Sequence, residues 1–409
     1  MAEGGPGLAL LRNRDFLRLW LANGLWWQAM WTEQLVFGWL ALDLTNSAWW
    51  VALLGFFRSV PLLFIGSFSA AITDRFDRRS LILGAQISGT AGYAWLGLLI
   101  WHGQLEYWHL AVVALANGAC WSVDWPTRRA IVPDLVGKGL VVEAMLLENI
   151  IQGFTRVIGP LGAGSLLAAV GTRGGLVALA GMGIAGVFLV MGIRTRSRAP
   201  VAPGGLRSSW QQMGAGLRYV RQQPRILGVV MVTAIMNAWT FPFTGLLPVF
   251  ARDVLGQGPL GLGMLAAASG VGALLGLVGV NLARRWCSKE WLYGGGSALA
   301  CVGVVGFACS STFGLSLGLM VLSGIGQAGF SIMQSAITLV EASDDMRSRA
   351  MGAVVLAIGA APLGQLQSGA MANAWGAPLA CGSLAGLALL ATLGTMVFLP
   401  GFVRPRTQH

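Results

Sequence analysis

The stretch 69–83, SAAITDRFDRRSLIL, places five charged residues within six positions, between two long apolar runs. Charged residues make up only 11% of the whole sequence, so their concentration here needs a physical reason. In a chain of apolar membrane spans, charge gathers in the short connections, because an ionised side chain inside the bilayer is costly. The stretch therefore predicts a charged loop between two membrane-spanning segments.

The composition supports the same interpretation along the entire chain. Of its 409 residues 55% are hydrophobic, and the mean hydropathy is +0.68. Apolar runs of about 20 residues recur, and at about 1.5 Å per residue each can cross the hydrocarbon layer as a helix. Because backbone polar groups cannot stay unpaired in lipid, we expect an all-α membrane protein. The twelve expected spans are 16–42, 48–72, 81–101, 109–126, 143–169, 174–194, 226–250, 259–283, 291–310, 313–340, 350–373 and 377–399.

The distribution of basic residues predicts the orientation of these spans. All but four of the 27 lysines and arginines fall near the two termini or in alternate connections; the exceptions are Arg58, Arg156, Arg173 and Arg252. Basic residues accumulate on the cytoplasmic side of membrane proteins, so we expect both termini in the cytoplasm. The net charge of +11 then reflects membrane topology, and no nucleic-acid partner is expected.

The longest connection divides the chain near its middle. Residues 195–225 begin as a flexible basic linker and end in a segment whose apolar residues share one helical face. Such a segment is typical of an amphipathic helix on the inner membrane surface. We therefore expect an N-terminal six-helix bundle (1–194), this cytoplasmic linker, and a C-terminal six-helix bundle (226–409).

The two halves also resemble each other weakly. TDRFDRRSL at 73–81 matches ARRWCSKEWL at 283–292, and GPLG at 159–162 matches APLG at 361–364, with similar offsets. Internal repeats of this kind are typical of transporters in which two related bundles enclose a binding site. We therefore expect two pseudo-symmetric bundles around a central cavity.

Several motifs carry a resemblance to a known family. Residues 70–79 keep the charged positions of the signature G-x-x-x-D-R-x-G-R-R, with Ala70 and Asp77 in place of its glycines. Residues 159–164 are similar to the G-P-x-x-G-G motif of antiporters. Further matching stretches are LRNRDFLRLW (11–20), DWPTRRAIVPDLV (124–136) and LRYVRQQP (217–224). The chain resembles the major facilitator superfamily, and within it the exporter subfamily that includes the enterobactin exporter and macrolide-efflux-like proteins.

This resemblance implies a secondary active transporter of the cell membrane, a monomer that works by alternating access. It implies an antiporter that uses protons to export a small amphipathic organic molecule, siderophore- or drug-like. An uptake carrier or a lysophospholipid flippase of the same fold is the alternative. A membrane enzyme is not expected, because no HExxH, GxSxG or nucleotide-binding loop is present. Neither a cofactor nor a metal ion is expected.

The resemblance also gives the charged stretch a role. Asp74 would lie near the cytoplasmic start of the eleventh span, where a carboxylate can accept hydrogen bonds from free helix N–H groups. The neighbouring arginines would pair with carboxylates of the other half and hold the inner side closed. The alternative is that these charges anchor a loop and set topology. The residues assigned to gating are Asp74, Arg75, Asp77, Arg78, Arg79, Arg128 and Arg129.

Three ionisable residues lie deep inside the expected spans, where charge is costly and marks function. Glu33, Arg58 and Arg156 fall at compatible depths, so Glu33 can pair with at least one of the arginines. A motion that changes this separation would couple conformation to proton binding; the alternative is a fixed ion pair that joins the spans. Asp124 is the second candidate for proton coupling, although its position at the end of the fourth span also suits a cytoplasmic gate.

Aromatic and amide side chains at helical spacing on the first span suggest one wall of a substrate cavity. Such a tryptophan stripe can equally pack against other helices or face lipid. The expected cavity residues are Trp26, Met30, Trp31 and Gln34, facing Asn237, Trp239, Gln327 and Gln334. Helix bending is expected at Gly159, Pro160 and Pro362, because a proline removes a backbone hydrogen bond within its helix.

Overall fold

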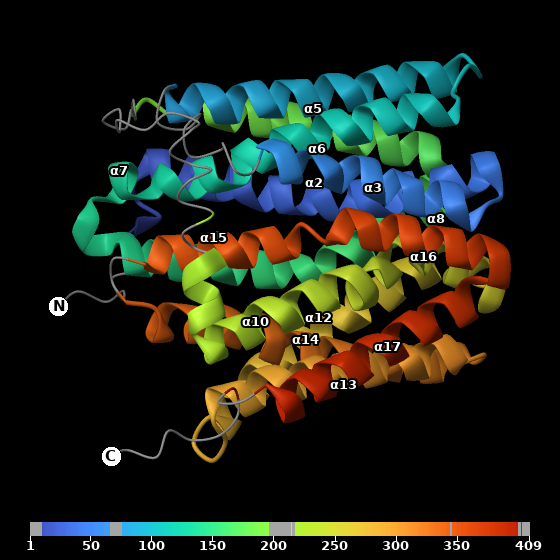
Figure 1. Ribbon diagram of the computed structural model, residues 1–409. Coiled ribbons are helices and arrows are strands. Elements are labelled where there is room, and N and C mark those ends of the chain that lie inside the picture. Colours follow the sequence, from blue (N-terminus) through green and yellow to red (C-terminus); the bar gives the residue numbers. More distant parts are fainter. Residues whose placement is uncertain are drawn as a thin grey trace. The chain divides into compact units, whose positions relative to one another are not determined.

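The computed structural model describes residues 10–65, 76–195, 214, 217–343, 346–399 and 402 (Figure 1). These residues form helices, and no β-strand occurs among them, which confirms the predicted all-α class. The helices up to residue 195 are α2 (Arg14–Thr45), α3 (Ala48–Ile65), α5 (Arg78–Trp101), α6 (Tyr107–Ala130), α7 (Val132–Val136), η2 (Lys138–Leu140) and α8 (Val141–Met191). The amphipathic helix predicted within 195–225 lies largely outside the described residues.

The helices that follow residue 223 begin with one irregular run. That run comprises α10 (Pro224–Ile235), the π-helical turn η3 (Met236–Thr240), the 3₁₀ segment η4 (Phe241–Leu246), α11 (Leu247–Val249) and a second π-helical turn, η5 (Phe250–Val254). Regular helices then follow: α12 (Pro259–Ala283), α13 (Lys289–Cys309), α14 (Phe313–Glu341), α15 (Arg347–Ile358), α16 (Ala361–Trp375) and α17 (Ala377–Phe398). Pro242 and Pro248 lie in the irregular run and cannot donate the hydrogen bonds that a regular α-helix requires.

The chain forms two compact units. The first contains Met1–Asn46 and Phe57–Gly204, and the second contains Ser47–Phe56 and Gly205–His409. The division therefore falls within α3, whose first residues group with the second unit and not with the N-terminal bundle. Ser47 donates a hydrogen bond to Asn373 (3.2 Å), and a Cβ at Gly369 would meet Ala52, so these residues pack on α16.

In the part of the chain that the structure describes, eight helical stretches are long and apolar enough to cross a membrane. They are 48–65, 141–191, 224–254, 259–283, 289–309, 313–341, 349–375 and 377–398. The 51-residue helix α8 is two helices in one, because Gly171 interrupts it with φ 67° and ψ −173°, a conformation that glycine alone adopts freely. This break separates the predicted spans 143–169 and 174–194. Helices α2, α5 and α6 also coincide with predicted spans, and at 24 to 32 residues they are long enough to cross.

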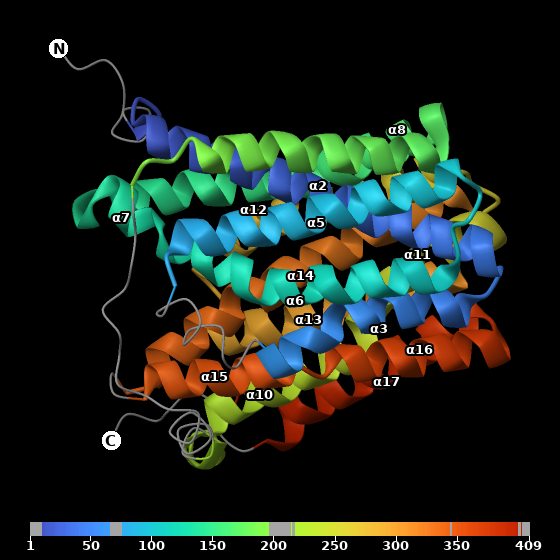
Figure 2. The same ribbon diagram turned by 90° about the horizontal axis from the view of Figure 1, so that it is seen from above.

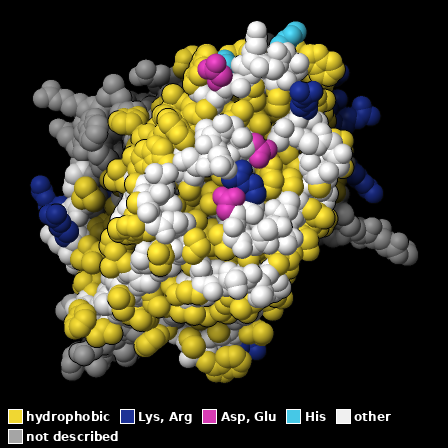
Figure 3. All heavy atoms as spheres, turned by 90° about the vertical axis from the view of Figure 1, so that its right-hand side faces the viewer, with side chains coloured by type: hydrophobic (Ala, Val, Ile, Leu, Met, Phe, Trp, Pro, Cys, Tyr) yellow, Lys and Arg dark blue, Asp and Glu magenta, His cyan; other side chains and the backbone are white. Residues whose placement is uncertain are grey.

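Large hydrophobic side chains lie exposed along many of these helices. Phe64, Leu98, Val177, Phe188 and Val397 each expose more than 60% of their surface. On the face drawn in Figure 3, hydrophobic side chains predominate and charged ones form a few small groups. A water-soluble protein rarely exposes such large apolar areas, whereas a lipid-facing surface requires them. The exposed apolar surface therefore agrees with the membrane environment that the composition predicts.

In the first unit α8 packs against α2 and α5, and α5 packs against α6 (Figure 2). At one end of these helices Asp15 accepts hydrogen bonds from the backbone N–H groups of Arg194 and Thr195 (3.0 Å each) and from the Thr195 hydroxyl (2.8 Å). Burial acts to raise the pKa of Asp15, but these hydrogen bonds and the charge of Arg18 outweigh it and hold that pKa below its ordinary value. The start of α2 is thus bound to the end of α8.

In the second unit α12, α13 and α14 pack closely, and α17 packs on α13. A Cβ at Gly272 would lie 2.0 Å from the Val321 carbonyl oxygen, and one at Gly276 would lie 2.6 Å from that of Ile325. The two backbones therefore touch along a Gly-x-x-x-Gly face, a common contact between membrane helices. The core of this unit surrounds Tyr293, which is fully buried.

Candidate functional site

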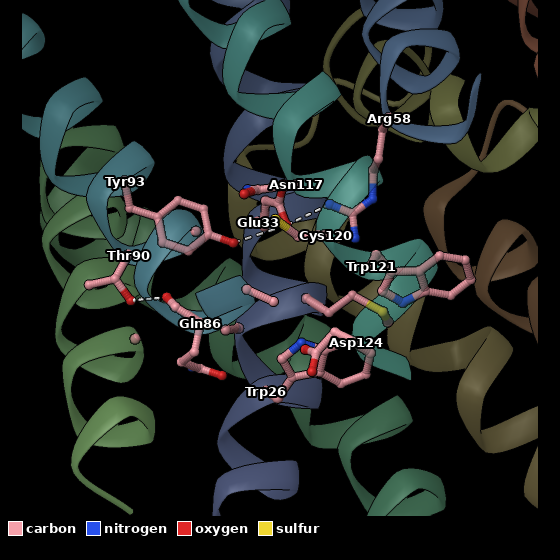
Figure 4. A pocket seen from close by; sticks show the side chains of 15 residues that line it. Trp26, Glu33, Arg58, Gln86, Thr90, Tyr93, Asn117, Cys120, Trp121 and Asp124 are labelled. Atoms are coloured by element: carbon pink, nitrogen blue, oxygen red, sulfur yellow. Dashed lines mark hydrogen bonds and ion pairs between the residues drawn. The ribbon is translucent and has the colours of Figure 1, made fainter. Parts of the chain in front are cut away.

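The carboxylate of Glu33 lies at the centre of a buried polar network in the first unit (Figure 4). Glu33 belongs to α2 and is only 3% exposed. Its Oε2 lies 2.5 Å from Nη1 of Arg58 on α3 and accepts a hydrogen bond from the Tyr93 hydroxyl on α5 (3.1 Å). Its Oε1 accepts a hydrogen bond from the side-chain amide of Asn117 on α6 (3.0 Å). A cation from α3 and hydrogen-bond donors from α5 and α6 therefore surround a single carboxylate.

A close helix contact holds Arg58 beside this network. A Cβ added at Gly118 of α6 would lie 2.0 Å from the backbone oxygen of Arg58, so α6 and α3 approach as closely as their backbones permit. The neighbouring residue, Asn117, then reaches Glu33 from the same helix. Glycine is required at position 118 because any side chain would push the two helices apart.

We expect Gly118→Ala to lower the free energy of unfolding by about 1–3 kcal/mol, because the added methyl group overlaps backbone atoms that cannot rotate away. Thermal or denaturant unfolding of the purified protein measures this change. Gly84→Ala on α5 is the matched control, because a Cβ there would have no neighbour within 4 Å. A loss no larger than that of the control would contradict the close contact.

Two carboxylates border the same small pocket. Glu33 and Asp124 both line it, together with Trp26, Met30 and Trp121 (Figure 4). Its cavity volume is about 60 Å³, which is enough for a few water molecules and too small for an organic substrate. The pocket therefore suits water molecules that bridge the polar groups around it.

Asp124 belongs to a second buried network. The Nε of Arg128 donates to both carboxylate oxygens of Asp124 (2.9 Å each), while Nη1 donates to Asn23 and Nη2 to Gln86 (2.8 and 2.7 Å). Asn23 in turn donates to both carboxylate oxygens of Glu148 (2.9 Å each). Asp124 and Arg128 are only 2% and 4% exposed. This network joins α2, α5, α6 and α8 and leaves no charge of the ion pair uncompensated.

The described part of the charged stretch 74–79 is bound within its own unit. Asp77 caps the N-terminus of α5, accepting hydrogen bonds from the backbone N–H and the hydroxyl of Ser80 (2.9 Å each). Arg78 pairs with Asp134 of α7 (2.6 Å), and Arg79 donates to the carbonyl oxygens of Val190 and Met191 at the end of α8 (3.3 and 2.7 Å). Asp74 and Arg75 lie outside the described residues. An aspartate at position 77, where the family signature has glycine, therefore has a capping function.

The two arginines at the end of α6 differ in their surroundings. Arg128 is enclosed in the network just described, whereas Arg129 is exposed, with its guanidinium 4.7 Å from the ring centre of Trp125. A gating role for either of them stays a prediction.

The two arginines considered as partners for Glu33 also differ. Arg58 is the one that pairs with Glu33. Among the described residues Arg156, on α8, has no hydrogen bond or ion pair. The Arg156 side chain is half-buried.

The residues expected in a substrate cavity are dispersed within the first unit. Trp26 and Met30 line the small pocket beside Glu33. Trp31 packs on Gly159 of α8, and its indole nitrogen is buried without an acceptor among the described residues. Gln34 is exposed. Whether these side chains touch a substrate stays a prediction.

In the second unit the predicted cavity residues lie in or against the protein core. The side-chain amides of Asn237 and Gln334 are buried and donate to the carbonyl and the hydroxyl of Thr233 (2.9 and 2.8 Å). Trp239 packs against the same core, and the Gln327 side-chain oxygen is buried without a donor among the described residues. Asn237 and Trp239 lie in the π-helical turn η3, a feature frequently found at functional sites.

The two prolines at predicted bending positions differ in whether the helix is interrupted beside them. Pro362 lies in the first turn of α16, directly after a break in the helix at Gly359 and Ala360, so helix 349–375 is interrupted there. Pro160 lies inside α8 and does not end it. The carbonyl oxygen of the preceding Gly159 accepts a hydrogen bond from the Gln28 side chain (3.2 Å), so this part of α8 is bonded to α2.

Sequence reasoning did not find the neutral members of these networks. Tyr93, Asn117, Asn23 and Gln86 complete the hydrogen bonds of the buried charges, yet each stands alone in an apolar run. Glu148 lies near the start of α8, where a negative charge is favourable by itself and does not indicate a network. Single polar residues inside predicted spans are the signal that could have marked them, because lipid disfavours them all.

Apolar helices that enclose buried ion pairs and hydrogen-bonded polar groups are typical of a polytopic membrane protein. Residues 6–404 match the model of the transmembrane secretion effector family. The chain therefore belongs to that family, an efflux-like branch of the major facilitator superfamily, and is a multi-pass protein of the plasma membrane and not an enzyme.

Characterised relatives are transporters. The chain is 29% identical over 139 residues to a staphyloferrin A transporter of Staphylococcus aureus, an alignment covering 34% of this chain and 35% of that protein. It is 23% identical over 287 residues to macrolide efflux protein A of Enterococcus faecalis, covering 65% of this chain and 85% of that protein.

Solved transporter structures share the fold. The nucleoside transporter NupG matches with a TM-score of 0.73 at 15% identity, covering 93% of this chain and 99% of that one. A peptide transporter POT in complex with sulfate matches with a TM-score of 0.75 at 11% identity, covering 96% and 95%.

Proposed function

We propose that this protein exports a small amphipathic organic molecule from the cell in exchange for protons. The observation that carries the proposal is the buried ion pair between Glu33 and Arg58, because an ionisable pair deep in a transporter helix is costly and needs a function. The names of the relatives, a siderophore transporter and macrolide efflux proteins, support export of such molecules.

The buried carboxylate of Glu33 can be stabilised either by the nearby cation of Arg58 or by a proton, and this alternation is the basis of the proposed coupling. With Arg58 at 2.5 Å, Glu33 is stabilised as a carboxylate by charge and by two neutral donors. A motion that draws α3 away from α2 removes the cation and leaves a buried carboxylate, which is then stabilised by taking up a proton. Return of Arg58 displaces the proton. Each cycle of the helices therefore binds and releases one proton at Glu33.

The small pocket offers these protons a path. Waters in a cavity of about 60 Å³ can bridge polar groups that do not touch, and Glu33 and Asp124 both line this cavity. Asp124 is held by Arg128 and is the second titratable group of the path. The other charged or titratable side chains that face the pocket are Arg58, Tyr93 and Cys120.

The proposed transport cycle depends on the complete architecture of the superfamily. We propose twelve membrane crossings in two six-helix bundles, both termini in the cytoplasm, a substrate cavity and a monomeric protein. We also propose that the charged cluster 74–79 holds the cytoplasmic side closed in one state. If Asp74→Ala left transport unchanged in correctly inserted protein, this gating role would be wrong.

The direct test is transport of two radiolabelled molecules that the names of the relatives supply, staphyloferrin A and a macrolide, into inverted membrane vesicles, with and without a proton gradient that is acidic inside. Exchange for protons predicts accumulation that rises with the gradient and collapses when a protonophore is added. Accumulation that is indifferent to the gradient rejects proton coupling. Movement in the opposite direction under the same gradient supports the uptake carrier instead.

A further inference from the structure

Arg156 lies near the middle of a long helix and has no partner among the residues that the structure describes. It lies midway between the start of α8 at Val141 and the break at Gly171, about 22 Å from each. The other buried ionic side chains of this unit described above each have an ion pair or hydrogen bonds. Among the described residues Arg156 has neither.

The guanidinium of Arg156 is nevertheless open to its surroundings. Its nitrogens do not occur among the sealed, unbonded polar atoms of the described residues, and the side chain as a whole is half-buried. Its N–H donors are therefore not fully sealed by the described part of the protein, so an acceptor can approach them.

The neighbours of Arg156 on α8 form a polar stripe. Asn149 and Gln152 lie two turns and one turn before it on the same helical face, and both line a small pocket with Trp27. One turn after it, Gly159 packs on Trp31, whose indole Cδ1 would lie 2.6 Å from an added Cβ. The indole N–H of Trp31 has no acceptor among the described residues. Hydrogen-bond donors without acceptors in the described chain and the flat rings of tryptophan side chains thus lie beside adjacent turns of α8.

Among the described residues no negatively charged acceptor is bonded to this arginine. An unpaired arginine at this depth is costly, and no contact in the described part of the protein offsets that cost. A planar carboxylate fits the guanidinium fork through two parallel hydrogen bonds, and a flat ring fits tryptophan side chains.

We infer that Arg156 binds the carboxylate of the transported molecule, so that the substrate is an organic anion with a planar apolar part. This inference rests on the proposed export function and narrows its substrate class. A carboxylate on a soluble molecule is the favoured source of the negative charge. The phosphate of a lysophospholipid is the other source and must be distinguished from it.

Three molecules of nearly equal shape and different charge provide the test: 2-naphthoate, 2-naphthamide and 2-naphthamidinium. We expect the full-length protein in nanodiscs of uncharged lipid to bind the anion about tenfold more tightly than the amide, and the amidinium least, because a charge-assisted pair is lost at each step. Isothermal titration calorimetry measures the three dissociation constants.

Two variants assign the preference to Arg156. Arg156→Gln is expected to make the three affinities equal to within about twofold. Arg156→Lys is expected to keep their order, with smaller differences between the three dissociation constants. Because Arg156 makes no hydrogen bond or ion pair with the described part of the chain, the Gln variant is expected to keep the unfolding temperature of the parent protein, which is measured in the same preparations.

Three results would overturn the inference. They are absence of saturable naphthoate binding, an order that ignores charge, and an order that survives in Arg156→Gln. Binding of lysophosphatidylglycerol without binding of naphthoate would overturn the soluble carboxylate as the source. These equilibrium measurements need no proton gradient, so loss of gradient-driven transport rejects the proposed function without affecting this inference.

Discussion

Replacement of Arg128 with glutamine is expected to lower the free energy of unfolding by about 3–5 kcal/mol. The side chain donates to Asp124, Asn23 and Gln86 in a region where it and Asp124 are only 4% and 2% exposed. Without the guanidinium, Asp124 stays buried as an uncompensated charge, and two amide oxygens lose their donor. Denaturant-induced unfolding of the purified protein measures the loss.

Two controls separate a buried ion pair from a general effect of removing an arginine. Arg129→Gln removes the adjacent but exposed arginine, whose contact is a stack on Trp125, and is expected to cost about 1 kcal/mol or less. Combining Arg128→Gln with Asp124→Asn is expected to recover part of the loss, because Asp124 then no longer leaves an uncompensated charge. If Arg128→Gln cost no more than Arg129→Gln, the buried network would not stabilise the fold.

The same variant tests the gating role predicted for Arg128. A residue that acts only as a gate would impair transport while leaving the free energy of unfolding unchanged. A residue that binds the first unit together, as the four-helix network implies, would impair both.

Replacement of Glu33 with glutamine is expected to abolish the acceleration of efflux by a proton gradient. Glutamine has nearly the same shape and can still bond to Asn117, but it cannot exchange a proton. Gradient-driven accumulation in inverted vesicles should fall to the rate seen without a gradient, while substrate affinity measured at equilibrium stays close to that of the parent protein. Unimpaired gradient-driven efflux would reject Glu33 as the coupling group.

Tyr93→Phe is the matched control for this prediction. It removes the hydroxyl that donates to Glu33 at 3.1 Å but leaves the ion pair with Arg58, so coupling is expected to persist. The double variant Glu33→Gln with Arg58→Gln addresses the alternative of a purely structural pair. If two neutral amides at these positions restored gradient-driven efflux, the pair would only hold helices together.

The helices could be predicted from the sequence with small errors at their ends. Helix α12 begins and ends at the predicted residues 259 and 283, and α13 and α14 differ from the predicted runs by two residues or fewer. Long apolar runs interrupted by charged connections carry this information locally, because a span must satisfy its own backbone hydrogen bonds. The irregular segment from Met236 to Val254 was not predicted, since π-helical turns have no simple hydrophobic pattern.

The site could be predicted only in part. Depth estimates at about 1.5 Å per residue correctly allowed Glu33 to meet an arginine, but they could not choose between Arg58 and Arg156. The choice depends on rotation of each helix about its axis and on the backbone contact at Gly118, which brings α3 against α6. Neither the rotation of a helix nor a contact between two helices can be deduced from the spacing of residues within one segment.

The sequence by itself determined that the chain is helical, apolar and charged mainly between its spans, because lipid imposes those properties on every segment separately. Only the tertiary structure decided which buried charges have partners. Tyr93, Asn117, Asn23 and Gln86 become donors or acceptors to ions through helices that meet in space and not in sequence. The same packing leaves Arg156 without a partner in the described chain, since the balance of buried charge is a property of neighbours and not of composition.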